Sequence, residues 1–212
     1  MRSLRHHVAQ ALLLALVLSA VTASPAAAGA PSDQLKAQID RVLKTLDDPE
    51  LKKEGKERDR RAAVRKIAND IFDFGETARR SLGRHWQPRT AAERDEFVEL
   101  FADLLERSYI SKVELYGGEK IQYLGDTIEA DQAKVQTKLL TKGGNEIPIE
   151  YRMHRKGDRW LVYDVVIEGV SLIANYRTQF NKIIQTASYA ELIRRMKSKQ
   201  AEVLLEDRKS VV

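Results

Sequence analysis

One carboxylate stands out as a possible catalytic group. Asp164 lies in the stretch WLVYDVVI, whose other positions are all apolar or aromatic. Burial raises the pKa of an unpaired carboxyl, and such a group beside a cavity can act as a general base. The alternative is a structural Asp that is held by an arginine, for which Arg177 is a candidate, or by backbone amides. We favour the structural role, because the sequence offers no oxyanion stabiliser or second catalytic group.

Other catalytic chemistry finds little support. Beyond the N-terminal residues the chain has two histidines, His85 and His154, and neither belongs to a metal-spaced set such as HExxH. A catalytic zinc site usually needs three protein ligands, so both histidines favour structural or surface roles. There are no cysteines, which excludes disulfides and thiolate metal sites. A GxSxG nucleophile elbow and a glycine-rich phosphate loop are also missing. We expect no metal and no cofactor.

The N-terminus has the layout of a secretory signal peptide. A basic start with Arg2 and Arg5 precedes an almost wholly apolar run from Ala11 to Val21, and small residues follow. This run of 11 residues is too short to span a bilayer, and no Cys stands near its end to carry a lipid. We expect cleavage after Ala28, with Ala30 as the other option, and export to a bacterial periplasm as a soluble single domain, residues 29–212.

The charge does not favour nucleic acid as a partner. The formal net charge of +5 falls to +3 once Arg2 and Arg5 leave with the signal. A nucleic-acid-binding protein needs a dominant basic face, and export also argues against this function. The densest basic stretch is residues 51–66, with eight bases against three acids. A solvated helix and loop is favoured there over a docking patch for acidic partners or anionic head groups.

Four helices are expected in the first half of the chain. Apolar residues at helical spacing predict the first two, over residues 33–48 and about 57–71. Asp73 is placed to cap a short third helix. Thr90 and Glu93 form the capping box of a fourth helix, which is the longest and carries a broad apolar face.

The periodicity then changes from helical to alternating. Residues 119–128 are a weak strand candidate and 132–141 a better one, and the turns KGGN and RKGD lead into two further strands. The last strand, RWLVYDVVI, is apolar on both faces. This pattern predicts a strand that is covered on both sides, in the centre of a meander.

Helical periodicity returns after Glu168 and Gly169. One helix is expected from Val170, folded back along the sheet, and another from about Tyr189, with apolar positions that continue to Val203 and Leu204. This order predicts an α+β fold, in which N-terminal and C-terminal helices wrap a twisted antiparallel sheet of about four strands, residues 119–167. The apolar faces can close into a solid core or leave a cavity, and ordinary packing favours the solid core.

Two segments resemble the MlaC family, also called the toluene-tolerance family. They are FDFGETARRSLGRHW with the following TAAERDEFVELFADLLERSYISKVELY, and GDRWLVYDVVIEGVSLIANYRTQF. The likeness extends from about Asp33 to Met196. The positions that match the family are Asp73, Phe74, Gly83, Trp86, Phe97, Phe101, Tyr109, Trp160, Asp164, Gly169, Val170, Ser171, Asn175, Tyr176, Arg177 and Phe180.

The resemblance implies a lipid carrier without enzymatic activity. Members of this family are periplasmic phospholipid-binding components of the Mla ABC transport system, which maintains outer-membrane lipid asymmetry. The implied partners are a phospholipid, an outer-membrane lipoprotein complex and the inner-membrane ABC transporter complex. The implied fold surrounds an apolar cavity for acyl chains. The candidate lipid-binding residues are Phe72, Phe74, Phe97, Phe101, Leu104, Val135, Leu139, Ile149, Tyr151, Trp160, Val162, Val166, Ile173, Tyr176, Arg177 and Phe180.

Two other classes of function stay open at the level of sequence. One is a small enzyme with a cavity that uses Asp164 as its base. The other is an interaction module with a solid core, which binds an envelope protein through residues 51–66 or the C-terminal helix. Tyr176 and Arg177 are equally ambiguous, because a position at the mouth of a cavity, where a guanidinium can meet a phosphate, competes with a structural role.

Overall fold

The computed structural model describes residues 30–114 and 116–198. The expected signal peptide, residues 1–28, and the apolar positions Val203 and Leu204 lie outside the described residues. The elements in chain order are α1 (Pro31–Asp47), α2 (Glu57–Ile71), α3 (Phe74–Leu82), a 3-10 turn η1 (Gly83–His85), α4 (Ala91–Glu114), β1 (Lys120–Glu129), β2 (Gln132–Leu140), β3 (Glu146–Lys156), β4 (Arg159–Ile167), β5 (Val170–Ser171), α5 (Leu172–Thr186) and α6 (Tyr189–Lys197).

Capping residues set the starts of α3 and α4, as the sequence predicts. The Glu76 amide donates to Asp73 Oδ1 at 3.0 Å, which fixes the start of α3. At the start of α4 the bonds are reciprocal: the Glu93 amide donates to Thr90 Oγ1 at 3.2 Å, and the Thr90 amide donates to Glu93 Oε2 at 2.8 Å. This reciprocal pair confirms the capping box and satisfies two backbone donors that the helix leaves unpaired.

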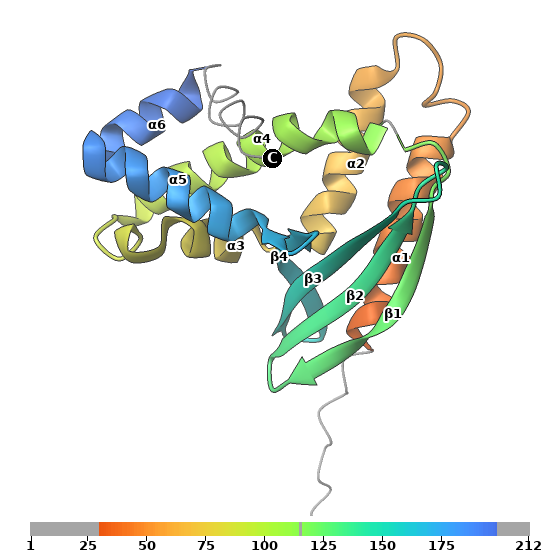
Figure 1. The fold of residues 1–212 in the computed structure, drawn as a ribbon. Helices are drawn as coiled ribbons and strands as arrows, with labels where there is room; N and C mark the ends of the chain where they lie inside the picture. The colour runs from red at the N-terminus through yellow and green to blue at the C-terminus, as the bar shows by residue number, and fades with distance from the viewer. Residues whose placement is uncertain (1–29, 115, 199–212) are drawn as a thin grey trace, which may run out of the picture.

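The strands form one antiparallel sheet in the order β1-β2-β3-β4-β5 (Figure 1). The meander is confirmed, with the two-residue β5 added to the four expected strands. Glu168 and Gly169 connect β4 to β5, and both have positive φ, 50° and 82°. Positive φ at both central residues is what a type I′ hairpin turn requires. Because Val170 pairs in β5, α5 begins at Leu172 rather than at Val170.

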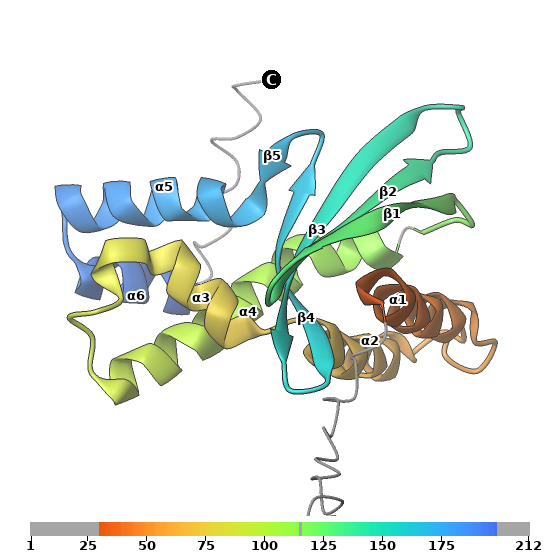
Figure 2. The ribbon, with the colours of Figure 1, turned by 90° about the horizontal axis from the view of Figure 1, so that it is seen from below.

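β4 lies between two layers of helices rather than in the middle of the sheet. It pairs along its length with β3, but with β5 only at Val166 and Ile167. α1 and α2 contact it from one side, and α3 and α5 contact it from the other (Figure 2). Both faces of β4 are therefore covered, which explains its continuous apolar sequence.

The buried apolar residues form two clusters. The helical cluster joins α3, α4, α5 and α6 and consists of Ala78, Leu82, Phe97, Phe101, Leu104, Ile173, Tyr176, Phe180, Ile183, Leu192, Ile193 and Met196. The sheet-side cluster joins α1, α2 and one face of the sheet and consists of Leu35, Ile67, Ile71, Ala133, Val135, Met153, Trp160 and Val162. The sequence suggests one apolar space between the sheet and the helices, but the buried apolar side chains lie in two separate clusters.

α5 does not fold back along the sheet, contrary to the expectation. Its buried residues Ile173, Tyr176, Phe180 and Ile183 pack in the helical cluster. Both ribbon views show the helix leading away from the strands after its first turn (Figures 1 and 2). The reason is that the apolar stripes of α3, α4 and α6 meet the stripe of α5, while β4 holds its N-terminus.

Candidate functional site

Asp164 has a structural role at the start of α5. Its side chain is buried and accepts three hydrogen bonds, from Ser171 Oγ at 2.6 Å, from the Ile173 amide at 3.1 Å and from Arg152 Nη1 at 3.3 Å. Ser171 is itself the N-cap of α5 and accepts from the Ala174 amide at 3.0 Å. The arginine beside Asp164 is therefore Arg152 on the neighbouring strand, which corrects the expected pairing. With both oxygens occupied, this carboxylate is poorly placed to act as a base.

Arg177 lies on the exposed side of α5, close to the end of α3. A Cβ added to Gly83 would stand 3.2 Å from Cδ of Arg177, and Gly83 has a φ of +54°. Both observations explain why a glycine ends α3: a side chain would be strained by the backbone and would press on the arginine stem. The aliphatic part of Arg177 thus packs on the helix end, as a structural role requires.

Six of the sixteen predicted lipid-binding residues lie in the helical cluster. They are Phe97, Phe101, Leu104, Ile173, Tyr176 and Phe180, and each is almost fully buried. The Phe101 ring centroid lies 5.1 Å from that of Tyr176 and 5.3 Å from that of Phe180, both in edge-to-face geometry. These are favourable contact distances for aromatic pairs. The rings fill the space between the helices with one another.

Five others lie in or against the sheet-side cluster. Val135, Trp160 and Val162 are buried in it, and Phe72 and Tyr151 pack against it. Burial raises the pKa of the Tyr151 hydroxyl to about 12, although a hydrogen bond with the Thr137 side chain opposes this shift. The apolar face continues beyond the buried part of the sheet through partly exposed residues, among them Leu139 and Ile149 of the predicted set.

The remaining three residues lie apart. The Phe74 ring lies beside that of Phe72, tilted by 30° with the centroids 5.8 Å apart, where α2 passes into α3. Val166 is buried on β4 and pairs with Ser171 of β5. Arg177 is exposed on α5, as described above. The structure therefore brings the predicted residues together as two groups and a few outliers.

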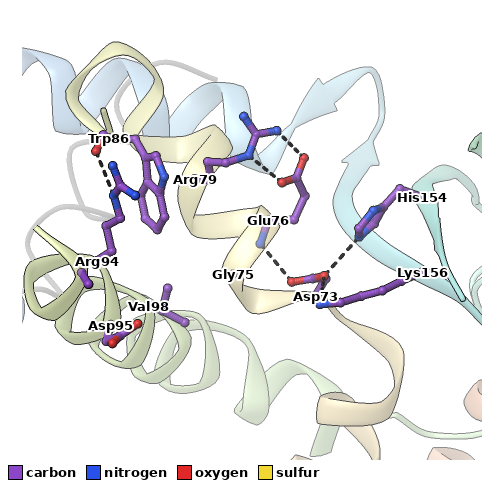
Figure 3. A pocket seen from close by; sticks show the side chains of 11 residues that line it. Asp73, Gly75, Glu76, Arg79, Trp86, Arg94, Asp95, Val98, His154 and Lys156 are labelled. Atoms are coloured by element: carbon purple, nitrogen blue, oxygen red, sulfur yellow. Dashed lines mark hydrogen bonds and ion pairs between the residues drawn. The ribbon is translucent and has the colours of Figure 1, made fainter. Parts of the chain in front are cut away.

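A charged groove of about 590 Å³ lies between α3, the start of α4 and the end of β3 (Figure 3). Its lining residues are Asp73, Gly75, Glu76, Arg79, Trp86, Ala91, Arg94, Asp95, Val98, His154 and Lys156. None of these lining residues belongs to the predicted lipid-binding set. The volume of the groove lies within the range of small-molecule sites.

Charged side chains in this groove interact with one another through short polar contacts. Lys156 Nζ lies 2.9 Å and His154 Nε2 3.2 Å from Asp73 Oδ2. Burial raises the pKa of Asp73, but the hydrogen bonds from the Glu76 amide and from Lys156 outweigh it and hold this pKa below its ordinary value. At the other end Arg94 lies over the Trp86 ring, 5.3 Å from its centroid. The groove therefore joins α3 to the sheet by electrostatic contacts.

The model of the MlaC protein family matches residues 36–198. This chain belongs to the MlaC family. A relative from Haemophilus influenzae, the intermembrane phospholipid transport system binding protein MlaC, is 22% identical over 147 residues, which cover 66% of this chain and 69% of the relative. A solved structure of the phospholipid-binding protein from Ralstonia solanacearum, in complex with a phospholipid, aligns with a TM-score of 0.72 at 23% identity. The alignment covers 82% of this chain and 98% of that one, and shows a shared fold.

In this MlaC family member, side chains of the basic stretch 51–66 form ion pairs with acidic residues. Lys52 contacts Asp47 at 2.8 Å, and Arg65 contacts Asp103 of α4 at 2.7 Å. These side chains are about half exposed. Such exposed pairs contribute little to stability, but they reduce the positive charge that the stretch presents to a partner. The contacts favour the solvated helix and loop.

The predicted lipid-binding set omits several residues in or against the sheet-side cluster, and Tyr123 is the one among them with a buried hydroxyl. It lies on β1, where Ile121 and Tyr123 stand on either side of the polar Gln122, and it packs against the cluster from the edge of the sheet. Alternation within residues 119–128 could have revealed it, but that stretch gave the weakest strand signal. Burial raises the pKa of the Tyr123 hydroxyl above its ordinary value.

The part of the chain that the structure describes contains neither a candidate membrane span nor a candidate metal cluster. Across residues 30–114 and 116–198, no helix has both the length and the apolar character needed to cross a membrane. The same ranges contain no group of three or more His, Asp or Glu residues that could hold a metal ion.

Proposed function

We propose that this MlaC family member is a phospholipid carrier that holds acyl chains between the sheet and helices α1 and α2. The observation that carries the proposal is the apolar sheet face beneath α1, which is only partly buried at residues such as Leu139, Ile149 and Val165. An apolar face that protein does not fully cover is what a lipid tail would complete. The names of the Haemophilus and Ralstonia relatives support a phospholipid as the ligand.

Within the predicted set, the sheet-side residues are the better candidates for lipid contact. Phe72, Val135, Leu139, Ile149, Tyr151, Trp160 and Val162 belong to that side. The rings of Phe97, Phe101, Tyr176 and Phe180 already pack on each other. To admit an acyl chain among them, the protein would have to break these contacts and separate four helices. We therefore assign the helical cluster to the core of the fold.

The energetics of this binding require direct handover. Each buried CH₂ contributes about 0.8 kcal/mol, so two acyl chains with on the order of 30 methylenes gain roughly 20 kcal/mol before entropic and desolvation costs. Spontaneous release into water would be very slow. The carrier must therefore exchange lipid in contact with membrane complexes. The proposed partners are the outer-membrane lipoprotein complex and the inner-membrane ABC transporter of the Mla system, reached in the periplasm after signal cleavage.

The proposed carrier leaves its lipid chemically unchanged. Both oxygens of Asp164 are committed to hydrogen bonds that hold α5. The test is to load the purified protein with isotopically labelled phosphatidylglycerol and to incubate it with acceptor vesicles that carry the transporter complex. We expect intact labelled lipid in the acceptor vesicles. Labelled hydrolysis products, or no uptake of lipid by the folded protein, would contradict the proposal.

A further inference from the structure

Tyr123 carries a buried donor without an acceptor. Its Oη atom is shielded from solvent and has no hydrogen-bond partner among the described residues. A buried polar group without a partner is rare in native proteins, because it forfeits its bonds to water and gains none in return. Such a group therefore indicates either a local cost that the fold tolerates or a ligand that supplies the acceptor.

The position of Tyr123 places this donor on the apolar face that we assign to lipid. Tyr123 pairs with Thr137 across β1 and β2, and Val135 pairs with Tyr151 across β2 and β3. Residues that face each other across antiparallel strands point to the same side, and so do residues two apart on one strand. These four side chains thus share the face that packs beneath α1.

The two tyrosines on this face, Tyr123 and Tyr151, differ in the polar surroundings of their hydroxyls. Thr137 Oγ1 donates to the Ile149 carbonyl at 3.3 Å, and the Thr137 side chain also acts on the Tyr151 hydroxyl, whose pKa it lowers against the effect of burial. The Tyr123 hydroxyl is thus among the buried polar groups without a described partner, whereas the Tyr151 hydroxyl is not. The acidic residue that influences Tyr123 from α1 is Asp40, and its carboxylate is paired with Lys36 at 2.6 Å on the exposed side of the helix.

The surroundings restrict what the acceptor can be. A phosphate would have to lose its water among apolar side chains such as Val135 and Ala133, which costs far more than one hydrogen bond returns. A neutral carbonyl carries a much smaller desolvation cost and accepts from a neutral hydroxyl. In a glycerophospholipid the acyl ester carbonyls lie between the head group and the tails, next to the apolar chains.

We propose that Tyr123 donates a hydrogen bond to an acyl ester carbonyl of the bound lipid, which makes the site selective for ester-linked lipids. The inference rests on the proposed function, since it needs lipid on the sheet-side face. The ester carbonyl is the group that is recognised, and Tyr123 is the residue that recognises it. The acyl chains supply affinity, and Tyr123 sets how deeply the glycerol end of the lipid enters.

The test compares two lipids that differ only at the carbonyls. Delipidated full-length mature protein is offered equal amounts of dioleoyl phosphatidylglycerol and its dialkyl ether analogue in mixed vesicles, and the lipid that it retains is quantified by mass spectrometry. A neutral hydrogen bond predicts that the wild type retains the ester lipid about five-fold over the ether lipid. In Tyr123→Phe this ratio falls to about one, while acyl-chain binding persists.

Two variants provide controls for this measurement. Tyr189→Phe removes a tyrosine hydroxyl of the helical layer, where Tyr189 Oη donates to the Glu93 carbonyl at 3.1 Å, and should leave the ester preference unchanged. Tyr151→Phe removes the hydroxyl beside the Thr137 side chain and should lower the thermal stability of the delipidated protein, while Thr137 keeps its bond to the Ile149 carbonyl. Tyr123→Phe should not lower that stability, because its hydroxyl has no partner to lose when lipid is absent.

The outcomes separate this inference from the proposed function. A wild type that takes up neither lipid contradicts both. A wild type that takes up both lipids equally, or a Tyr123→Phe variant that keeps the full ester preference, overturns the role of Tyr123 and leaves the carrier function standing. Loss of the ester preference in Tyr123→Phe alone, with unchanged stability without lipid, is the result that we expect.

Discussion

The buried carboxylate of Asp164 accepts a hydrogen bond from the Ile173 amide at 3.1 Å and so fastens the first turn of α5 to β4. A free backbone donor at a helix N-terminus is thereby satisfied by a residue of the sheet rather than of the helix. Arg152 on the adjacent strand balances the charge. Through this contact the helical layer and the sheet are joined at one end of α5.

Replacing Asp164 with Asn should weaken this junction. The amide retains one acceptor oxygen but loses the charge opposite Arg152 and one hydrogen bond, so we expect a loss of about 2 kcal/mol in the free energy of unfolding. Urea denaturation followed by circular dichroism measures it. The exposed Asp158→Asn is the control and should stay within about 0.5 kcal/mol of wild type. Equal stability of the two variants would contradict the role of Asp164.

A second prediction concerns the turn between β4 and β5. Gly169 has a φ of +82°, which an alanine adopts only with strain, so Gly169→Ala should lower the free energy of unfolding by about 1 kcal/mol. Gly143 lies in another hairpin turn, and its nearest neighbour is the Thr141 Oγ1 atom, 3.9 Å from an added Cβ. Gly143→Ala should therefore cost much less. A larger loss of stability in Gly143→Ala than in Gly169→Ala would show that this turn does not depend on the positive φ at Gly169.

Asp73 should make the stability depend on acidic pH. Its pKa in the folded protein lies below the ordinary value, because hydrogen bonds from the Glu76 amide and Lys156 outweigh the effect of burial. The stabilisation is therefore complete above the pKa of the unfolded chain and is lost as the pH falls through the lower pKa of the folded protein.

The variant that isolates this effect is Asp73→Asn, since Asn is also a good N-cap and keeps the bond to the helix. At neutral pH the variant should be less stable than the wild type, because the charge opposite Lys156 is gone. At strongly acidic pH, where Asp73 is protonated in both the folded and the unfolded state, the two curves should converge. A stability difference that stays constant across this range would contradict the assigned role.

Placing a charge on the sheet-side face should displace lipid. Ile149→Arg introduces a guanidinium on the partly exposed apolar face of β3, where an acyl chain would have to desolvate it. We expect at least a ten-fold lower content of copurified phospholipid, as measured by mass spectrometry. Leu124→Arg, at an exposed position on β1, should keep the wild-type lipid content. Equal loss in both variants would indicate general destabilisation instead.

Much of the secondary structure could be predicted, because periodicity, helix caps and turns depend on residues that are close in the sequence. α2 begins and ends where the periodicity of residues 57–71 predicts, and the caps at Asp73 and Thr90 fix the next two helices. The strands follow from alternation and from the turns between them. The identity of Asp164 as a structural carboxylate could also be anticipated, since no catalytic partner accompanied it.

The tertiary partners could not be predicted in the same way. Periodicity shows that α5 has a buried face, but it does not show whether this face meets the sheet or other helices. For the same reason the sequence predicts that Phe101 and Val135 line one space, although they lie in different clusters. The arginine that meets Asp164 is across a strand pair, at Arg152, and strand register is a long-range property.

The central claim is that the sheet-side face holds a phospholipid. The most direct test is to purify the mature protein from a bacterial periplasm without detergent, extract it with organic solvent, and identify and quantify the lipids by mass spectrometry. We predict glycerophospholipid in near-stoichiometric amount. A fully folded protein with no phospholipid, or with only traces of it, would contradict the claim.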